Sequence, residues 1–211
     1  MTEWYRRTTW TKVDEEEFFA KLKRARQGSR PQYLMIQAST LTGTTDPVLL
    51  DAAEFLILKL LADYPDNKFE RSSSLGLLGD IYRYRQQYDT AISYYKNAID
   101  FEKEYPQVQT GVFLEFAELV VKLDKREYFD FVEQTLSEKQ EEYPFPLYKY
   151  KIFSLLAIIN KIRGNTEVAD RFAERADEYA AAKTSGFRYH PSVGIVTERD
   201  PDLDERMKKD L

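Results

Sequence analysis

Histidine is the side chain most suited to acid–base chemistry near neutral pH, and this chain of 211 residues contains one, His190. It lies between Tyr189 and Pro191, with no acid, base or metal ligand beside it in the sequence. We therefore interpret His190 as a surface or capping residue and expect no catalysis to depend on it. The absence of cysteine excludes disulfides, zinc–thiolate sites and thiol nucleophiles, and a single histidine excludes a multi-histidine metal site.

The remaining reactive side chains also lack the spacing that chemistry requires. The serine run from Ser72 to Ser74 has no histidine or lysine at catalytic spacing, so we expect it to cap the next helix. The acidic run from Glu15 to Glu17 cannot converge on one cation, because consecutive helix residues point in different directions. Gly76 and Gly79 lie inside a helical stripe and are expected to pack, not to cradle phosphate. The sequence therefore predicts no catalytic, cofactor-binding or metal-binding residue.

Charge separates the start of the chain from the rest. Residues 1–30 carry eight Lys and Arg against five Asp and Glu, a balance of +3, and the remainder carries 23 against 31, a balance of −8. The basic run from Lys21 to Arg30 lacks the glycine-rich loop or interleaved aromatics of a phosphate or nucleic-acid site. The acidic bulk argues against nucleic-acid binding and would suit a basic protein partner.

No segment has the character of a signal peptide or a membrane span. No apolar stretch follows the first residues, and the longest one, from Phe55 to Ala62, is interrupted by Lys59. About twenty apolar residues are needed to cross a bilayer. We expect a soluble protein that makes no membrane contact and, in a bacterium, a cytoplasmic one.

Helical periodicity organises most of the chain. Asp14 and Glu17 have the spacing of a capping box, so a first helix is expected to begin at Asp14. Asp46 followed by Pro47 predicts another helix start, with an aspartate cap and proline in the first turn. The clearest segment runs from Ser72 to Pro106 and contains two apolar stripes with a short break at Gln86 and Gln87. The stripe residues are Leu75, Leu78, Gly79, Tyr82, Ala91, Tyr95 and Ala98.

This pattern resembles the tetratricopeptide repeat, a helix–turn–helix of about 34 residues. Leu75 stands where the family often has tryptophan, and Pro106 comes about three residues late. Weaker copies flank this one, so four helical hairpins would cover residues 31–183. Their matching residues are Ala38, Ala53, Ile57 and Leu60; Phe113, Phe116, Ala117, Val120, Phe129, Val132 and Leu136; and Phe153, Leu156, Ala157, Ala169, Ala173 and Ala176.

We accordingly predict an all-α fold, a tetratricopeptide-like superhelix of helical hairpins with about nine helices between residues 14 and 183. Residues 1–30 would form an N-terminal segment and capping helix, and residues 31–183 the helical-repeat domain. Residues 184–211 would form an aromatic loop and a charged, mobile tail, with at most a short last helix from Asp202.

The resemblance implies that the first helix of each hairpin lines a concave, partner-binding face. The charged residues expected on this face have mixed signs. They do not form the clamp with which co-chaperones of this family hold a peptide's C-terminal carboxylate. The loop from Phe187 to His190 adds exposed aromatics, which favour protein contacts. The residues expected to bind a partner are Asp80, Arg83, Glu118, Lys122, Lys151, Ser154, Lys161, Phe187, Arg188, Tyr189 and His190.

The opening of the chain is similar to a family of small bacterial tetratricopeptide-like proteins associated with polymorphic or Rhs-type toxins. The similarity lies in Trp4-Tyr5-Arg6, Trp10-Thr11, Glu16-Glu17-Phe18-Phe19, Lys21-Leu22, Arg24-Ala25-Arg26, Gln32-Tyr33-Leu34, Ile36-Gln37-Ala38 and, near the end, Gly186-Phe187-Arg188-Tyr189-His190. It implies an immunity protein, without enzymatic activity or cofactor, whose partner is a toxin domain, here a basic one. The alternative is a scaffold or regulatory adaptor for another bacterial protein. The sequence leaves the oligomeric state open.

Overall fold

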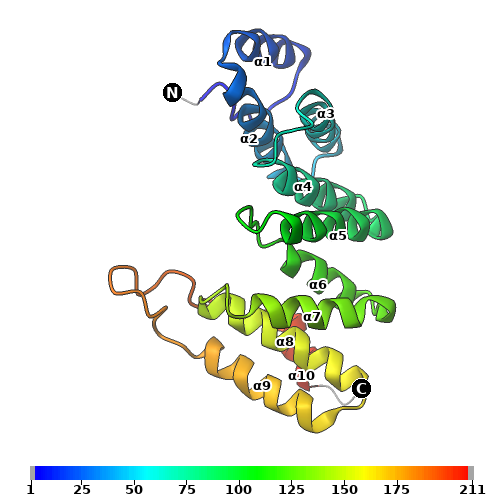
Figure 1. Cartoon of the computed structure of the whole chain (residues 1–211), viewed down its shortest axis with the longest axis vertical. Helices are drawn as coiled ribbons and strands as arrows, with labels where there is room; N and C mark the ends of the chain where they lie inside the picture. Colours follow the sequence, from blue (N-terminus) through cyan, green and yellow to red (C-terminus); the bar gives the residue numbers. More distant parts are fainter. Residues whose placement is uncertain (1–2, 209–211) are drawn as a thin grey trace. The chain divides into compact units, whose positions relative to one another are not determined.

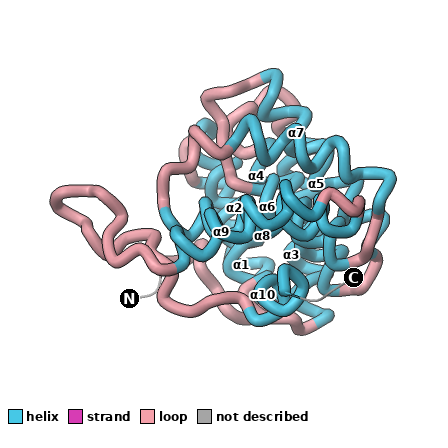
Figure 2. Tube along the Cα trace, turned by 90° about the horizontal axis from the view of Figure 1, so that it is seen from below, coloured by secondary structure: helices cyan, strands magenta, loops and turns pink. Residues whose placement is uncertain are grey.

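The chain is described by a computed structural model that places residues 3–208. Within this range the regular structure is entirely helical (Figure 2), which confirms the predicted all-α class. Nine α-helices lie between residues 12 and 180, as expected, and a tenth lies in the tail (Figure 1). They are α1 (Lys12–Arg24), α2 (Arg30–Thr42), α3 (Pro47–Asp63), α4 (Arg71–Tyr84), α5 (Tyr88–Glu104), α6 (Val112–Lys122), α7 (Phe129–Lys139), α8 (Pro146–Ile162), α9 (Thr166–Ala180) and α10 (Pro201–Lys208), with 3₁₀ turns at Gln27–Ser29 and Arg126–Tyr128.

The helices form two compact units, Met1–Val112 and Phe113–Leu211, a division that falls inside the predicted repeat domain. In the first unit, α2 packs on α3 and α4 on α5. In the second, α8 packs on α9, and the ring of Phe116 in α6 contacts those of Tyr128 and Phe131 beside and within α7. Each unit therefore contains two of the four helical pairs that the sequence predicted.

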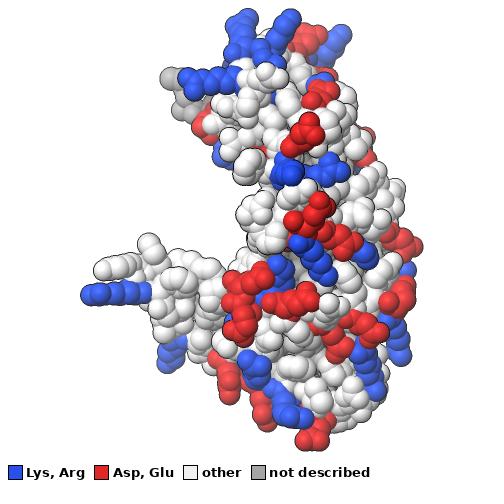
Figure 3. Space-filling model, viewed as in Figure 1, with Lys and Arg blue, Asp and Glu red and all other residues white. Residues whose placement is uncertain are grey.

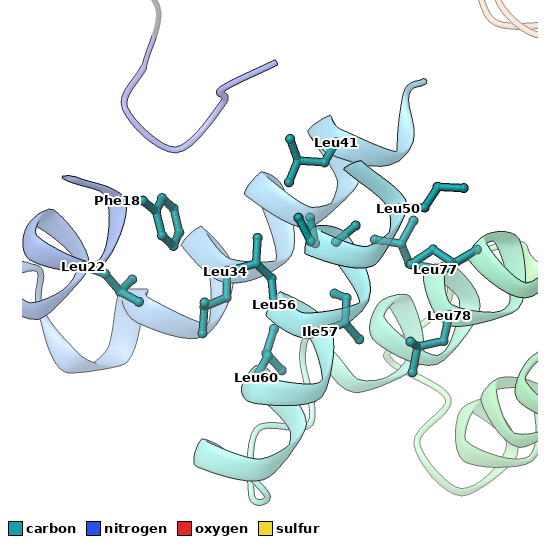
Figure 4. Packing of buried hydrophobic residues seen from close by; sticks show 14 residues of the cluster. Phe18, Leu22, Leu34, Leu41, Leu50, Leu56, Ile57, Leu60, Leu77 and Leu78 are labelled. Carbon is teal, nitrogen blue, oxygen red and sulfur yellow. The ribbon is translucent and has the colours of Figure 1, made fainter. Parts of the chain in front are cut away.

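The core of the first unit joins α1 to α2, α3 and α4 (Figure 4). Phe18 is fully buried and contacts the rings of Trp4 and Trp10, which close the end of the unit. The predicted core residues of the second and third helices are fully buried as well. They are Ala38, Ala53, Ile57 and Leu60.

The crossing of α4 and α5 depends on a residue without a side chain. A Cβ atom placed on Gly79 would lie 2.3 Å from Cε1 of Tyr95, whose ring is fully buried. Leu78, Ala91 and Ala98 are also fully buried at this crossing. The predicted positions of these small residues are thus confirmed, because they lie where the two helices approach closely, whereas Leu75 and Tyr82 of the same stripes are only partly buried.

In the second unit, α8 is the central helix. Twelve of its residues are buried, including Phe153, Leu156 and Ala157, and it contacts α7, α9 and α10. The predicted core positions of α6 and α7 are buried too, as are Ala169 and Ala176 of α9. A helix that is apolar on nearly all sides has to be buried by neighbouring elements on nearly all sides. Helices α7, α9 and α10 contact α8 in this way.

The start of α1 differs from the prediction. Thr11 is the N-cap, and Asp14 completes the capping box from the third helical position, accepting a hydrogen bond from the Thr11 backbone amide at 2.9 Å. The hydrogen bonds from the Thr11 amide and hydroxyl lower the pKa of Asp14 to about 2. Glu17, expected to close the box, instead pairs with Arg7 at 2.5 Å. The helix therefore begins two residues earlier than predicted.

The expectation that the run from Ser72 to Ser74 caps a helix is also wrong. The run lies inside the first turn of α4, and Ser72 is fully buried. Its hydroxyl donates to the buried carboxylate of Glu102 at 2.7 Å, and that carboxylate also accepts the Thr110 amide at 3.0 Å. Ser72 thus joins α4 to the end of α5 and lies out of reach of any substrate.

The predicted start of α3 is confirmed and gives a direct test. Asp46 is the N-cap, its carboxylate accepts the Val48 amide at 2.8 Å, and Pro47 occupies the first turn. Asp46→Ala should lower the free energy of unfolding by about 1 kcal/mol, because the amide loses its partner. The adjacent Thr45→Ala variant is the control, and urea denaturation is the measurement. Equal midpoints for the two variants would contradict the cap.

Candidate partner-binding surfaces

Asp80 and Arg83, the two candidates in the first unit, lie one turn apart on α4. The Asp80 carboxylate accepts the Tyr95 hydroxyl at 2.7 Å and lies 3.4 Å from an Arg83 guanidinium nitrogen. The Arg83 guanidinium also lies 5.1 Å from the centre of the Tyr84 ring. Asp80 therefore positions a core tyrosine, whereas the partly exposed Arg83 and Tyr84 present a cation and a ring to the surface.

A second polar cluster on this unit was not anticipated. Arg85 pairs with Asp51 and Glu54 of α3, each at 2.6 Å, and the Tyr82 hydroxyl donates to Glu54 at 2.5 Å. That hydrogen bond, followed by burial, raises the pKa of Tyr82 to about 12. The cluster ties one hairpin to the next across about thirty residues of sequence, a separation at which local patterns carry no signal.

In the second unit, the candidates on α6 and α8 separate into accessible and inaccessible residues. Glu118 of α6 pairs with Lys151 of α8 at 2.7 Å, and both are partly exposed, while Lys122 is exposed. Lys161 donates to the backbone oxygen of Met207 in α10 at 2.8 Å. Ser154 is fully buried, so the prediction that its side chain lies on an accessible face is wrong.

The aromatic loop after α9 is fastened at its base and exposed at its tip. The Phe187 ring stacks on Phe145, with centroids 5.1 Å apart, and the Ser185 amide donates to the Pro191 oxygen at 2.7 Å. Tyr189 is 79% exposed, and the Arg188 guanidinium lies 5.3 Å from its ring centre. The loop thus presents an aromatic side chain and a cation on a closed turn.

Gly194 fixes this loop to the start of α8. Its φ is +69°, and a Cβ atom there would lie 2.5 Å from the Phe145 ring. Its carbonyl accepts the Leu147 amide at 2.8 Å, one of the amides that a helix start leaves without an internal partner. His190 is also exposed. It closes the loop through its backbone, because its carbonyl oxygen accepts a hydrogen bond from the Ser185 hydroxyl at 2.8 Å.

The expectation of a mobile tail is wrong for its last helix. Leu203 and Met207 of α10 are buried, and Arg199 joins Asp204 to Asp177 of α9. The Tyr150 hydroxyl of α8 donates to Asp204 at 2.9 Å. Residues 199–208 are therefore a folded part of the second unit.

Alkaline titration should detect this docking. Burial, followed by the hydrogen bond to Asp204, raises the pKa of Tyr150 to about 12, against about 10 for a free tyrosine. Because the folded-state pKa is the higher one, its contribution to stability is complete below pH ~10 and is lost as the pH rises toward 12. Tyr150→Phe should remove one late-titrating phenol from the phenolate absorbance curve, and Tyr82→Phe another. If the phenol lost in Tyr150→Phe were one that titrates near pH ~10, the contact would be contradicted.

One surface feature of the first unit, an exposed apolar face of α3, was not recognised from the sequence. Val48, Phe55 and Leu58 of α3 are each between 46% and 67% exposed, although they are apolar. Apolar residues on both faces of this helix were the available signal.

Basic side chains gather over the part of this unit that carries α1 (Figure 3), as the charge balance of residues 1–30 predicts.

Within residues 3–208, no group of three histidine, cysteine, aspartate or glutamate side chains is placed to hold a metal ion. None of the helices placed in this range has the length and apolar character needed to cross a membrane. No family model matches the chain, and no curated protein or solved structure matches it either.

Proposed function

We propose that this chain is a non-catalytic protein-binding module and that the loop from Ser185 to Gly194 is its principal contact surface. The observation that carries the proposal is the exposed Tyr189 beside Arg188 on a loop fastened by Phe187 and Gly194. Tyrosine and arginine are enriched among the residues that dominate binding energy. A closed loop also loses less conformational entropy on binding than a free one.

The four helical pairs support the proposal of a tetratricopeptide-like array, in which the first helix of each pair faces the partner. Arg83 on the first unit is partly exposed, and Glu118, Lys122 and Lys151 on the second are partly or fully exposed, so each unit would offer polar contacts of its own. Glu118 and Lys151 already neutralise each other, as Asp80 does with Arg83. Such residues would steer association and set its salt dependence more than they would hold the complex.

We further propose that the partner is a toxin domain, with this chain as its cytoplasmic immunity protein. The similarity of the opening residues and of the segment from Gly186 to His190 to toxin-associated proteins supports this choice. The balance of −8 over residues 31–211 favours a basic partner. A scaffold that binds another bacterial protein would use the same loop, and the following experiment separates the two.

The test is co-expression with the product of the gene encoded next to this one. That product should stop growth when expressed alone, and growth should be restored when this chain is present and co-purifies with it. Tyr189→Asp is the matched variant, since it changes an exposed residue and should abolish rescue without altering the fold. A harmless neighbour, or a toxin that is rescued without forming a complex, would refute the immunity proposal and leave the scaffold.

A further inference from the structure

The last helix of the chain lies on the side of the second unit where the partner-facing residues of α6 and α8 were predicted. It contacts α8 (Figure 1), buries Leu203 and Met207, and reaches α6 through Arg206, which donates to the Val121 oxygen at 2.9 Å. The predicted partner-binding residue Lys161 donates to the Met207 oxygen, at the same C-terminal end of the helix. A segment of the chain itself therefore occupies this face.

Both ends of α10 are satisfied by specific groups. At its start the Asp200 carboxylate accepts the Asp202 amide at 2.9 Å, and the Tyr150 hydroxyl accepts the Asp200 amide at 3.1 Å. At its end the Lys161 ammonium meets a backbone oxygen, where a cation suits the helix dipole. The face thus recognises a helix by its two ends, as well as by the side chains between them.

The surface of α8 between these two contacts suits a helix that approaches closely. Tyr150 and Lys161 are joined on one face by Ser154 and Ala157, at steps of four, three and four residues. Both intervening side chains are small and buried. The Ser154 hydroxyl has no hydrogen-bond partner. Small residues between two polar anchors form a surface on which a helix can pack closely.

Helix α10 is suited to be displaced from this face by another helix. Helix α10 has eight residues, fewer than an isolated helix needs to be stable in water, so its conformation depends on this face. Only Leu203 and Met207 are buried, and irregular chain from Ala181 to Asp200 connects it to α9. A longer helix with the same side chains would present the same contacts and a more stable conformation.

We propose that the face formed by α6 and α8 is a second docking site, which binds a short amphipathic helix of a partner protein and which α10 occupies until that helix displaces it. The partner helix has acidic residues in its first turn, two apolar residues four apart, and a cation in its last turn. This inference rests on the proposed protein-binding function and adds a second surface and the chemistry of its ligand.

The test uses the full chain and a labelled peptide of residues 198–208, Glu-Arg-Asp-Pro-Asp-Leu-Asp-Glu-Arg-Met-Lys. Leu203→Asp together with Met207→Asp should release α10 and leave the face open. This variant should bind the peptide at least ~10-fold more tightly than the natural chain, in which the tethered helix competes at high effective concentration. Arg199→Gln, which weakens the tether at Asp204 and Asp177 and keeps the apolar residues, should give an intermediate affinity.

Two controls make the result specific. A peptide carrying the same two aspartates should not bind, and Lys161→Glu in the released variant should weaken binding of the natural peptide several-fold. No peptide binding to either released variant, or equal binding to the natural and released chains, would overturn the inference. A failure here would leave loop-mediated binding of a partner unaffected, whereas loss of rescue in co-expression would leave the peptide result unaffected.

Discussion

Replacing Gly79 with leucine is expected to lower the free energy of unfolding of the first unit by about 3 kcal/mol. Leucine favours a helix over glycine by almost 1 kcal/mol, so helix propensity alone predicts the opposite sign. Packing decides the outcome, because even the first atom of a side chain would lie 2.3 Å from the Tyr95 ring. That ring is fully buried, and its hydroxyl is held by Asp80, so it cannot move without breaking a hydrogen bond.

A pair of alanine variants in the same helix sharpens the test. Gly76→Ala adds a Cβ atom 3.3 Å from a methyl group of Val112, a contact that a small shift can relieve. It should therefore leave stability unchanged or raise it by up to ~1 kcal/mol. Gly79→Ala should instead destabilise by about 2 kcal/mol. Urea denaturation followed by circular dichroism measures both, and equal shifts for the two variants would show that the crossing of α4 and α5 is looser than described.

The hairpin that this test probes was the part of the fold most visible in the sequence. Leu78, Gly79, Ala91 and Ala98 recur at helical spacing, and each of them packs where that spacing places it. Such stripes could be identified because one face of each helix is buried against its neighbours and the other is exposed to solvent. Helix α8 offered no comparable contrast, since twelve of its residues are buried. The burial of Ser154 was missed for this reason.

Helix starts were predictable only where one cap was possible. Asp46 followed by Pro47 had no rival, and it caps α3. At α1, Thr11 with Asp14 and Asp14 with Glu17 both have the capping spacing. Arg7 decides between them by pairing with Asp14 and Glu17, each at 2.5 Å. That choice depends on where the preceding chain lies, which local spacing does not encode.

The part of the candidate site that lies on helices was predicted as a set of polar residues, and the structure gives several of them another role. Asp80 holds Tyr95, Lys161 holds the end of α10, and Glu118 is paired with Lys151. Breaking such a contact to reach a partner would offset part of the energy gained. These partners lie between 15 and 46 residues away from the predicted site residues, so no local pattern could reveal them. Among residues 3–208, the tyrosine ring of the exposed loop has no such competing contact except the adjacent Arg188.

Tyr189→Ala is therefore expected to weaken partner binding by about 2 kcal/mol, or about 30-fold in Kd. Stability should change by less than ~0.5 kcal/mol, because the side chain is 79% exposed. Phe69→Ala is a matched control, since Phe69 is an aromatic residue of the first unit with the same exposed fraction. Calorimetry with the co-purified partner gives the Kd of the natural chain and of both variants. A loss for Phe69→Ala and none for Tyr189→Ala would move the interface to the other unit.

The position of the loop should matter as well as its side chains. Gly194→Ala would place a Cβ atom 2.5 Å from the Phe145 ring, on which Phe187 stacks, and would shift the loop that presents Tyr189. Gly186→Ala carries the same backbone strain, with φ of +81°, but its Cβ atom would meet nothing within 4 Å. Strain common to both variants cancels in the comparison, so the difference measures the fastening at Phe145. Gly194→Ala should bind the partner about tenfold more weakly than Gly186→Ala, and equal affinities would mean that the partner reorders the loop when it binds.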